Sequence, residues 1–177
     1  MKFYRPSPRG LPTSEFLGEV FVFGAGECIK QRGFNPQLAE VISKQILDGY
    51  FSLDEIIKVA PKVKVSLFKE VPCDYGVRLG SQLEGVIARL KSDSDTRRAI
   101  AVLARPDDKI PPCIMLVQFL IREQRLVTIA YMRSWDIGLG FAYDVDTFQK
   151  MGAKVAEGVG VIQGDIIVLV GSAHLYQ

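Results

Sequence analysis

Cysteine is scarce in this sequence, which holds only Cys28, Cys73 and Cys113 and no C-x-x-C pair. An odd, sparse set without that spacing argues against a disulfide framework and against a zinc site. We therefore expect no bound metal, and we expect the protein to work in a reducing cytoplasm.

Long apolar runs are also missing. No run reaches membrane-spanning length without a charge or a glycine, and the first residues lack the apolar stretch of a secretory signal. The charges nearly balance, with 22 basic and 20 acidic residues and a net charge of +2. Because such a balance creates no field that attracts a polyanion, we expect neither a membrane nor a nucleic acid as partner. A few placed arginines would instead hold the phosphate of a small molecule.

What the sequence does contain is enough apolar residues for one core. With 177 residues and 48% hydrophobic content, residues 1–177 are expected to form one domain. Apolar runs predict strands at 16–23, 98–103, 113–121, 126–132 and 165–170, the third and fourth joined as a hairpin. The last strand is almost purely β-branched or leucine, which predicts burial on both faces. The first ten residues, rich in proline and glycine, are expected to be irregular.

Helix boundaries are marked by capping residues. Asn35 followed by Pro36 predicts a helix that runs to residue 48. Serine–glutamate pairs three residues apart predict helices that begin at 52 and 81, and Asp146 with Gln149 predicts a helix over 146–157. The order of these elements predicts an α+β fold, a single domain with a large mixed β-sheet packed with helices.

Cys113 is the candidate nucleophile. A lone cysteine is most often a small buried hydrophobe, which is how we interpret Cys28 and Cys73. Cys113 differs because Pro111 and Pro112 fix the backbone just before it. Arginines elsewhere in the chain would also favour the reactive thiolate form.

Several motifs follow one another from about residue 70 to the end of the chain. They are Tyr75-Gly76, Asp95-Thr96-Arg97-Arg98, Pro112-Cys113, Arg133-Ser134-x-Asp136-x-x-Leu139-Gly140, Phe148, Gly164-Asp165 and His174-Leu175-Tyr176, with looser matches at Arg9-Gly10-x-Pro12-Thr13 and Asn35-Pro36. In this order and spacing the sequence resembles the thymidylate synthase superfamily, which includes the pyrimidine-nucleotide hydroxymethylases. The resemblance implies a thymidylate synthase-like fold, a homodimer, and 5,10-methylenetetrahydrofolate as the cofactor.

The resemblance also implies roles for individual residues. Cys113 matches the nucleophile that adds to C6 of a pyrimidine nucleoside monophosphate, and Asp136 matches a carboxylate near the base and the folate. Further positions match contacts to the phosphate and to the sugar 3′-hydroxyl. The phosphate set is Arg133 with Ser134, then Arg97 and Arg98 reaching into the partner subunit, and more loosely Arg9; the sugar set is His174 and Tyr176. Arginine suits this task because a planar guanidinium holds a phosphate dianion bidentately.

The residues alone leave other interpretations open. Without the resemblance, Arg97-Arg98 is best interpreted as a solvated turn before a strand. His174 is either a hydrogen-bonded core histidine or a ligand contact, and Trp135 is interpreted as a packing residue. Gly24-Ala25-Gly26 lacks the third glycine of a dinucleotide-binding loop, so we interpret it as a turn that ends a strand.

Asp144 decides which base we expect. Thymidylate synthases carry asparagine at the matching position, whose carboxamide suits O4 and N3–H of uracil, whereas cytidylate hydroxymethylases of the superfamily typically carry aspartate. Cytosine presents an N4 amino donor and an N3 acceptor, which a carboxyl group can pair. Asp144 could instead cap a helix, but Asp146 with Gln149 makes the better capping box, so we favour base recognition. Water rather than hydride would then complete the reaction.

Three features depart from the family pattern. Ile42 stands where a catalytic glutamate is expected; Glu40 points elsewhere on the helix and Gln45 lies nearer the same face. Ile114 replaces the histidine that usually follows the nucleophile. The chain also stops after Tyr176, without the usual C-terminal tail that closes over the folate, and we expect such a site to admit water more easily.

The sequence therefore supports three hypotheses. The first is a homodimeric, folate-dependent C5 hydroxymethylase of dCMP or CMP, which would make a modified nucleotide for a nucleoside natural product or, in the host cytoplasm, for a viral genome. The second is a short thymidylate synthase that acts on dUMP. The third is a catalytically silent homologue that binds a nucleotide or a partner protein.

Overall fold

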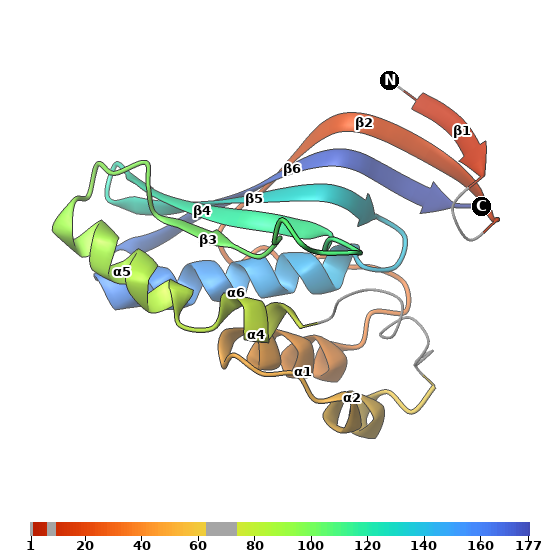
Figure 1. The fold of residues 1–177 in the computed structure, drawn as a ribbon, viewed down its shortest axis with the longest axis horizontal. Helices are drawn as coiled ribbons and strands as arrows, with labels where there is room; N and C mark the ends of the chain where they lie inside the picture. Colours follow the sequence, from red (N-terminus) through yellow and green to blue (C-terminus); the bar gives the residue numbers. More distant parts are fainter. Residues whose placement is uncertain (1, 7–9, 63–73) are drawn as a thin grey trace.

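The computed structural model describes residues 2–6, 10–62 and 74–177, and its architecture confirms the predicted α+β class. A mixed sheet of six strands, in the order β1-β2-β6-β5-β4-β3, forms one layer. The helices of the described residues lie together against one face of this sheet (Figure 1). The second layer therefore covers only one side of the sheet.

The strands form a sheet with a single parallel pair. They are β1 (Lys2–Pro6), β2 (Pro12–Phe23), β3 (Ile100–Val102), β4 (Ile114–Arg122), β5 (Arg125–Asp136) and β6 (Ile162–Tyr176). β5 and β6 run parallel, and the other neighbours are antiparallel. β4 and β5 form the predicted hairpin around Glu123 and Gln124, which both adopt positive φ angles. Because β5 and β6 are parallel, their carboxyl ends lie at the same edge of the sheet.

The first two helices begin at the capping residues that the sequence predicted. The helices are α1 (Pro36–Leu47), α2 (Leu53–Val59), α4 (Tyr75–Leu79), α5 (Gln82–Ser92) and α6 (Phe141–Val159). The side chain of Asn35 accepts hydrogen bonds from the first turn of α1, and that of Ser52 accepts one from Glu55. Ser81 precedes α5, but its side chain makes no capping hydrogen bond, so the capping box predicted there is wrong.

The longest helix, α6, differs from the prediction at both ends. It begins after Gly140, which has no side chain to signal a cap, and ends at Gly160, whose φ of 89° is left-handed and suits glycine. Asp146, the predicted cap, lies inside the helix and pairs with Lys150 at 2.9 Å. The predicted capping box of Asp146 with Gln149 is therefore wrong, and Asp144 belongs to the first turn of α6.

The strands also extend beyond their predicted limits. Residues 2–6 were expected to be irregular, but they pair with β2 because that strand offers them a free edge. β5 continues past residue 132 to Asp136, and β6 continues past residue 170 to Tyr176. The strand predicted at 98–103 is shorter, at Ile100–Val102. The motif residues at 133–136 and 174–176 therefore lie on strands.

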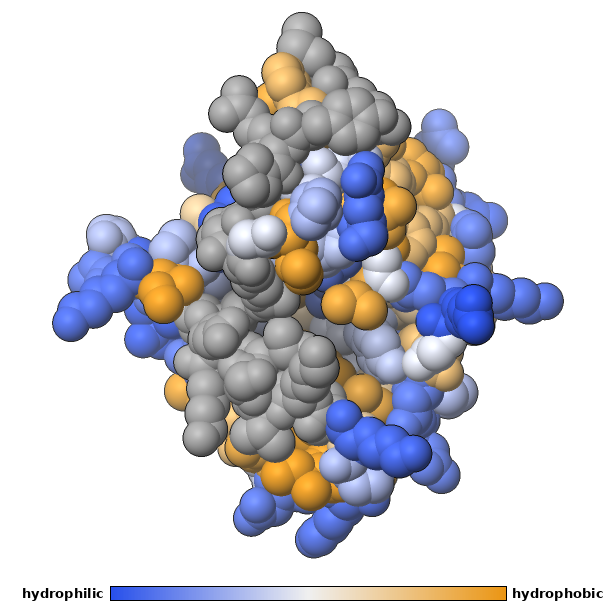
Figure 2. Space-filling view, turned by 90° about the vertical axis from the view of Figure 1, so that its right-hand side faces the viewer, coloured by the Kyte–Doolittle hydropathy of each residue, from blue (hydrophilic) through white to orange (hydrophobic). Residues whose placement is uncertain are grey.

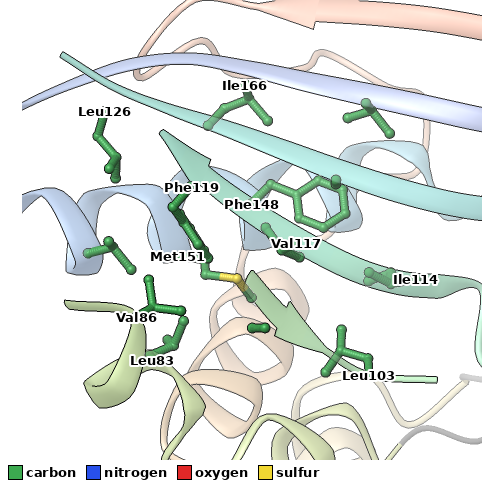
Figure 3. Close-up of a cluster of buried hydrophobic side chains, with 14 of the residues drawn as sticks. Leu83, Val86, Leu103, Ile114, Val117, Phe119, Leu126, Phe148, Met151 and Ile166 are labelled. Carbon is green, nitrogen blue, oxygen red and sulfur yellow. The ribbon is translucent and has the colours of Figure 1, made fainter. Parts of the chain in front are cut away.

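The core fills the space between the sheet and α6 (Figure 3). Phe148 and Met151 of α6 are fully buried, and they lie against Val117 and Phe119 of β4 and Ile166 of β6. Burying each such side chain stabilises the fold by roughly 1.5–3 kcal/mol. This packing holds the first turn of α6 beside the carboxyl end of β5.

The opposite side of the sheet is apolar and has no helix over it among the described residues. We call it the outer sheet face; it carries Val20, Val22, Ile129, Tyr131, Ile167 and Leu169. Val20 and Val22 are 56% and 59% exposed. Ile167 and Leu169 are only half-buried, so the prediction that their strand is buried on both faces is wrong for this chain alone.

Candidate active site

Cys113 stands immediately before β4, with its backbone held from two sides. Its N–H donates to the phenolic oxygen of Tyr75 at 3.0 Å, and its carbonyl accepts from the backbone N–H of Arg133 at 2.9 Å. The residue is half-buried. The thiol therefore stands on a fixed backbone between α4 and β5, a suitable position for a nucleophile.

The guanidinium of Arg133 supports the turn that leads to Cys113. Its Nε donates to the carbonyls of Pro111 and Pro112 at 3.0 and 3.1 Å, and Nη2 donates to Pro111 at 2.8 Å. These bonds were not anticipated, because the sequence suggested only a phosphate contact. The side chain is exposed, and among the contacts of the described residues Nη1 takes no part. A guanidinium has five donors, so capacity for an anion remains.

Ser134, His174 and Tyr176 gather at the shared carboxyl edge of β5 and β6. The Oγ of Ser134 lies 3.4 Å from Nδ1 of His174. The rings of His174 and Tyr176 meet edge to face, with centroids 5.3 Å apart. Figure 2 looks onto this end of the molecule, where apolar and polar residues are interspersed. The parallel register of the two strands thus joins residues forty positions apart in sequence.

Asp136 shapes the turn between β5 and α6. Its Oδ1 accepts from the backbone N–H groups of Gly138 and Leu139 at 2.9 and 3.0 Å, and its carbonyl accepts from Gly140. These bonds satisfy the backbone of the turn just before the helix. The described contacts of Asp136 are therefore structural, and its charge also acts on Asp144.

Asp144 is held by the indole of Trp135. Oδ2 of Asp144 accepts from Nε1 of Trp135 at 2.8 Å. Although part of Asp144 remains exposed, protein atoms surround its carboxyl group, and this burial raises the pKa of Asp144 to about 7. The hydrogen bond from Trp135 opposes the rise in pKa, and the charge of Asp136 adds to it. Near neutral pH the carboxyl group is therefore present both with and without its proton.

Asp144 lines a cavity of about 110 Å³ between the helices. The other lining residues are Ile42, Gln45, Ile46, Tyr50, Phe51, Ile56 and Tyr75. Asp144 is the sole carboxylate among these lining residues. Because pockets for whole ligands measure about 300–1,000 Å³, this one suits part of a ligand, such as a single ring.

The face of α1 towards this cavity carries no acid. Ile42 lines the cavity, whereas Glu40 points to α6 and pairs with Lys150 at 2.6 Å. The amide of Gln45 is occupied by the backbone of Ser52 and the carboxylate of Glu55. α1 therefore offers no acidic side chain at the cavity that could replace the catalytic glutamate expected from the family pattern.

Tyr75 is the residue of this site that the sequence analysis did not assign. It joins Cys113 to the cavity that contains Asp144. Burial raises the pKa of Tyr75, and the nearby Cys113 and Asp144 raise it further, so the phenol keeps its proton. Gly76 sets its position, since a Cβ there would collide with the backbone of Gln45 and Tyr50. The Tyr75-Gly76 motif was the available signal.

A comparison with known protein families identifies the family of this chain. The model of the thymidylate synthase family, described as "Thymidylate synthase", matches residues 68–177. The chain belongs to the thymidylate synthase family. The match contains every candidate site residue except Arg9, but it excludes α1 with Ile42. The family assignment thus rests on the C-terminal part of the chain, which carries Cys113, Arg133 and Asp144.

Curated relatives carry the same family name over a limited length. The chain is 32% identical over 113 residues to the thymidylate synthase of Homo sapiens, which covers 62% of this chain and 36% of that protein. It is 32% identical over 114 residues to bifunctional dihydrofolate reductase-thymidylate synthase 1 of Arabidopsis thaliana, covering 62% and 22%. A bifunctional enzyme of Glycine max is 33% identical over 108 residues, covering 59% and 20%. The match therefore spans about a third or less of each relative.

Other residues of the thymidylate synthase motifs lie away from Cys113. Arg97 and Arg98 are exposed and precede β3, where Ala99 pairs with Phe119 of β4. Phe119 lies further along β4 than the residue that follows Cys113. At about 3.3 Å per strand residue, Arg97 and Arg98 are therefore on the order of 20 Å from Cys113. One copy of the chain thus does not bring these arginines to its own thiol. Arg9 lies outside the described residues.

A second, larger hollow adjoins the first. It measures about 360 Å³ and is lined by Gly33, Asn35, Leu38, Val59, Ala60, Pro61, Lys62 and Tyr143. Leu38 lies one turn from Ile42 on α1, and Tyr143 precedes Asp144, so the two hollows are neighbours. Over the described ranges, no three His, Cys, Asp or Glu residues cluster as a metal site would require. Within the same ranges, no helix is both long and apolar enough to span a membrane.

Proposed function

We propose that residues 1–177 form one thymidylate synthase-like domain that catalyses folate-dependent C5 hydroxymethylation of a cytidine monophosphate nucleotide, dCMP or CMP. The observation that carries the proposal is the carboxyl group of Asp144 in a cavity that it shares with Tyr75, the hydrogen-bond partner of Cys113. The matched relatives are longer than this chain, so their named activity comes to it as part of this proposal.

Cys113 and the carboxyl edge of β5 and β6 would hold the nucleotide. The thiolate of Cys113 adds to C6 of the ring, which makes C5 nucleophilic. Arg133 binds the phosphate through donors that its bonds to the proline carbonyls leave over, and Ser134 adds a hydroxyl. His174 and Tyr176 contact the sugar 3′-hydroxyl, a position that ribose and deoxyribose share.

Asp144 would select the base. A cytosine ring in the cavity presents an amino donor at position 4 and an acceptor at N3, and a carboxyl group can meet both. Uracil presents the opposite pattern and would leave buried polar groups unpaired, which is how such sites discriminate strongly. A pKa of about 7 keeps both the donor and the acceptor forms of Asp144 accessible at neutral pH.

The larger hollow fits the cofactor, 5,10-methylenetetrahydrofolate. Its walls are largely apolar, with Leu38 and Val59 beside the Tyr143 ring, and Lys62 adds a positive charge that suits a carboxylated tail. When bound, this cofactor supplies the one-carbon unit that C5 of the pyrimidine accepts. Asp136, the last residue of β5, would be the carboxylate between base and folate.

Proton transfer at the base would fall to Tyr75 and Asp144. Ile42 gives α1 no acid at the cavity, whereas Asp144 reaches the cavity from the opposite helix. Tyr75 keeps its proton and can donate through its hydroxyl. The access of water to this site then completes the reaction as a hydroxymethyl group.

We further propose a homodimer that buries the outer sheet face. An uncovered apolar layer of this kind normally marks a contact between proteins. In a twofold pair, Arg97 and Arg98, with Arg9, can serve the phosphate site of the partner subunit, which fits their distance from Cys113 in one copy. The sparse cysteines support the cytoplasm as the setting of this enzyme.

Two further candidates each have an observation in their favour. C5 methylation of dUMP is favoured by the relatives, whose names all contain thymidylate synthase. A catalytically silent nucleotide-binding homologue is favoured by Ile42 at the cavity.

One incubation separates the three candidates. The protein is mixed with 5,10-methylenetetrahydrofolate and, in turn, dCMP, CMP and dUMP, and the nucleotides are weighed by mass spectrometry. We expect a gain of CH₂O on a cytidine nucleotide. A gain of CH₂ on dUMP would establish the methylase instead, and unchanged mass on every nucleotide, with binding retained, would establish the silent homologue.

A further inference from the structure

Trp135 makes the two oxygens of Asp144 unequal. An indole N–H can only donate, so the 2.8 Å bond from Nε1 fixes Oδ2 as an acceptor. When Asp144 takes up a proton, Oδ1 is therefore the favoured oxygen, because a carbonyl oxygen accepts from the indole N–H better than a protonated oxygen does. A carboxyl group without such a partner could place the proton on either oxygen.

Packing gives the indole little freedom to leave this position. Trp135 is 1% exposed. Phe21 of β2 meets its ring edge-on with centroids 5.3 Å apart, and Phe141 of α6 lies against it at 4.6 Å. Trp135 and Asp144 also belong to adjacent rigid elements, the end of β5 and the first turn of α6. The donor is thus preorganised and needs no ligand to position it.

We propose that the indole N–H of Trp135 fixes Oδ2 of Asp144 as the oxygen that accepts from the 4-amino group of cytosine, which makes Trp135 a positioning residue for base selection. The proposal rests on the proposed function. With Oδ2 as acceptor at position 4 and Oδ1 carrying the proton towards N3, the pair matches cytosine and opposes uracil. If the proton could move to the oxygen at position 4, the acid would match O4 of uracil equally well.

The surroundings of Asp144 give the hydrogen bond a measurable effect on titration. Asp136, the last residue of β5, acts on Asp144 with a like charge, and Tyr75 of α4 and Tyr50 after α1 line the same cavity as Asp144. The cavity-lining residues of α1 are uncharged. Burial and the charge of Asp136 raise the pKa of Asp144, whereas the hydrogen bond from Trp135 lowers it by favouring the ionised form. Loss of this hydrogen bond should therefore raise the titration midpoint of Asp144.

The test is Trp135→Phe, which keeps a ring and removes the donor. Carbon-13 NMR of labelled aspartate, on the protein without nucleotide, should show the Asp144 midpoint rising by about one pH unit. The ratio of kcat/KM for dCMP to that for dUMP, measured at pH 6, should fall about tenfold. Since the chain has one tryptophan, global replacement by benzothienylalanine removes the same N–H at nearly constant shape, should Trp135→Phe not fold.

Phe21→Leu is the matched control. It disturbs the packing of the indole but leaves the N–H of Trp135 in place, so the Asp144 midpoint should stay where it is. An unchanged midpoint in Trp135→Phe, or an equal rise in Phe21→Leu, overturns the proposal. If wild type converts none of the nucleotides, the proposed function fails, while the NMR midpoint still decides whether Trp135 controls Asp144.

Discussion

The backbone N–H of Arg133 donates to the carbonyl of Cys113 at 2.9 Å, which makes the candidate phosphate ligand and the candidate nucleophile neighbours across β4 and β5. The side chain of Arg133 reinforces this by binding the carbonyls of the two prolines before the thiol. A phosphate drawn to Arg133 would thus arrive next to the sulfur. In the proposed function, this contact would couple phosphate binding at Arg133 to the reaction at Cys113.

Replacing Asp144 by asparagine together with Trp135 by phenylalanine should change the preferred base. With Trp135 in place its N–H would hold the carboxamide oxygen at position 4, the pattern that suits cytosine, whereas Trp135→Phe/Asp144→Asn frees the carboxamide to turn its NH₂ to O4 and its oxygen to N3–H of uracil. The ratio of kcat/KM for dCMP to that for dUMP should fall by at least about a hundredfold. Steady-state kinetics with both nucleotides measures this, and an unchanged ratio would limit Asp144 to a structural part in the first turn of α6.

The single substitution Asp144→Asn should alter how stability depends on pH. The pKa of Asp144 is about 7 in the folded protein against an ordinary 3.8, so between these values the folded state holds a proton that the unfolded chain has released. Stability consequently falls as pH rises through this window, by up to a few kcal/mol. Asparagine does not titrate and avoids the loss.

Urea unfolding at two pH values checks this effect. Asp144→Asn should match wild type near pH 4, where the native carboxyl group is protonated, and should exceed it by a few kcal/mol at pH 8. A difference between the two proteins that is the same at both pH values would refute the raised pKa.

Removing the hydroxyl of Tyr75 should loosen the nucleophile. Tyr75→Phe leaves the N–H of Cys113 without its 3.0 Å acceptor, an omission that costs about 1–3 kcal/mol at a buried site. We expect kcat to drop at least about tenfold while the KM for nucleotide changes little. Tyr50→Phe, which takes a hydroxyl from the same cavity without touching Cys113, should lower kcat far less. Equal losses in both variants would argue against positioning by Tyr75.

Subunit mixing tests whether Arg97 and Arg98 act in the partner subunit. Cys113→Ser and the double variant Arg97→Ala/Arg98→Ala should each be inactive. When equal amounts are unfolded and refolded together, half of the dimers are mixed and each holds one intact site, so activity should return to roughly a quarter. No recovery, with mixed dimers verified by mass spectrometry, would place the arginines in their own subunit or outside catalysis.

The oligomeric state can be tested separately at the outer sheet face. Leu169→Glu puts a charge in the middle of that face and should yield a monomer by light scattering. Ile162→Glu, at a 63% exposed position at the start of the same strand, should remain dimeric. A dimer in both variants would move the interface elsewhere.

The sequence predicted those features whose cause is local. Asn35 and Ser52 cap their helices because the capping oxygen and the backbone N–H groups that donate to it lie within three residues. The start of α6 was missed because Gly140 gives no such signal, whereas Asp146 and Gln149 imitate one. Asp146 instead lies inside α6 and forms an ion pair with Lys150, one turn further along the same helix.

The candidate site shows the same division between local and tertiary causes. Motif order alone identified Cys113, Arg133 and Asp144. The hydrogen bonds from Trp135 to Asp144 and from Cys113 to Tyr75 depend on how α6 and α4 pack on the sheet. No spacing in the sequence predicts them. Burial raises the pKa values of Asp144 and Tyr75, and these contacts oppose that rise.

The central claim is that the sulfur of Cys113 bonds to the pyrimidine, and a mechanism-based trap tests it most directly. 5-Fluoro-dCMP carries fluorine in place of the C5 proton, so with 5,10-methylenetetrahydrofolate the covalent complex cannot break down and should accumulate. Peptide mass spectrometry should then locate the nucleotide on Cys113, and Cys113→Ser should bind the nucleotide without becoming labelled. Labelling of Cys28 or Cys73, or a protein that binds the nucleotide and stays unmodified, would contradict the account.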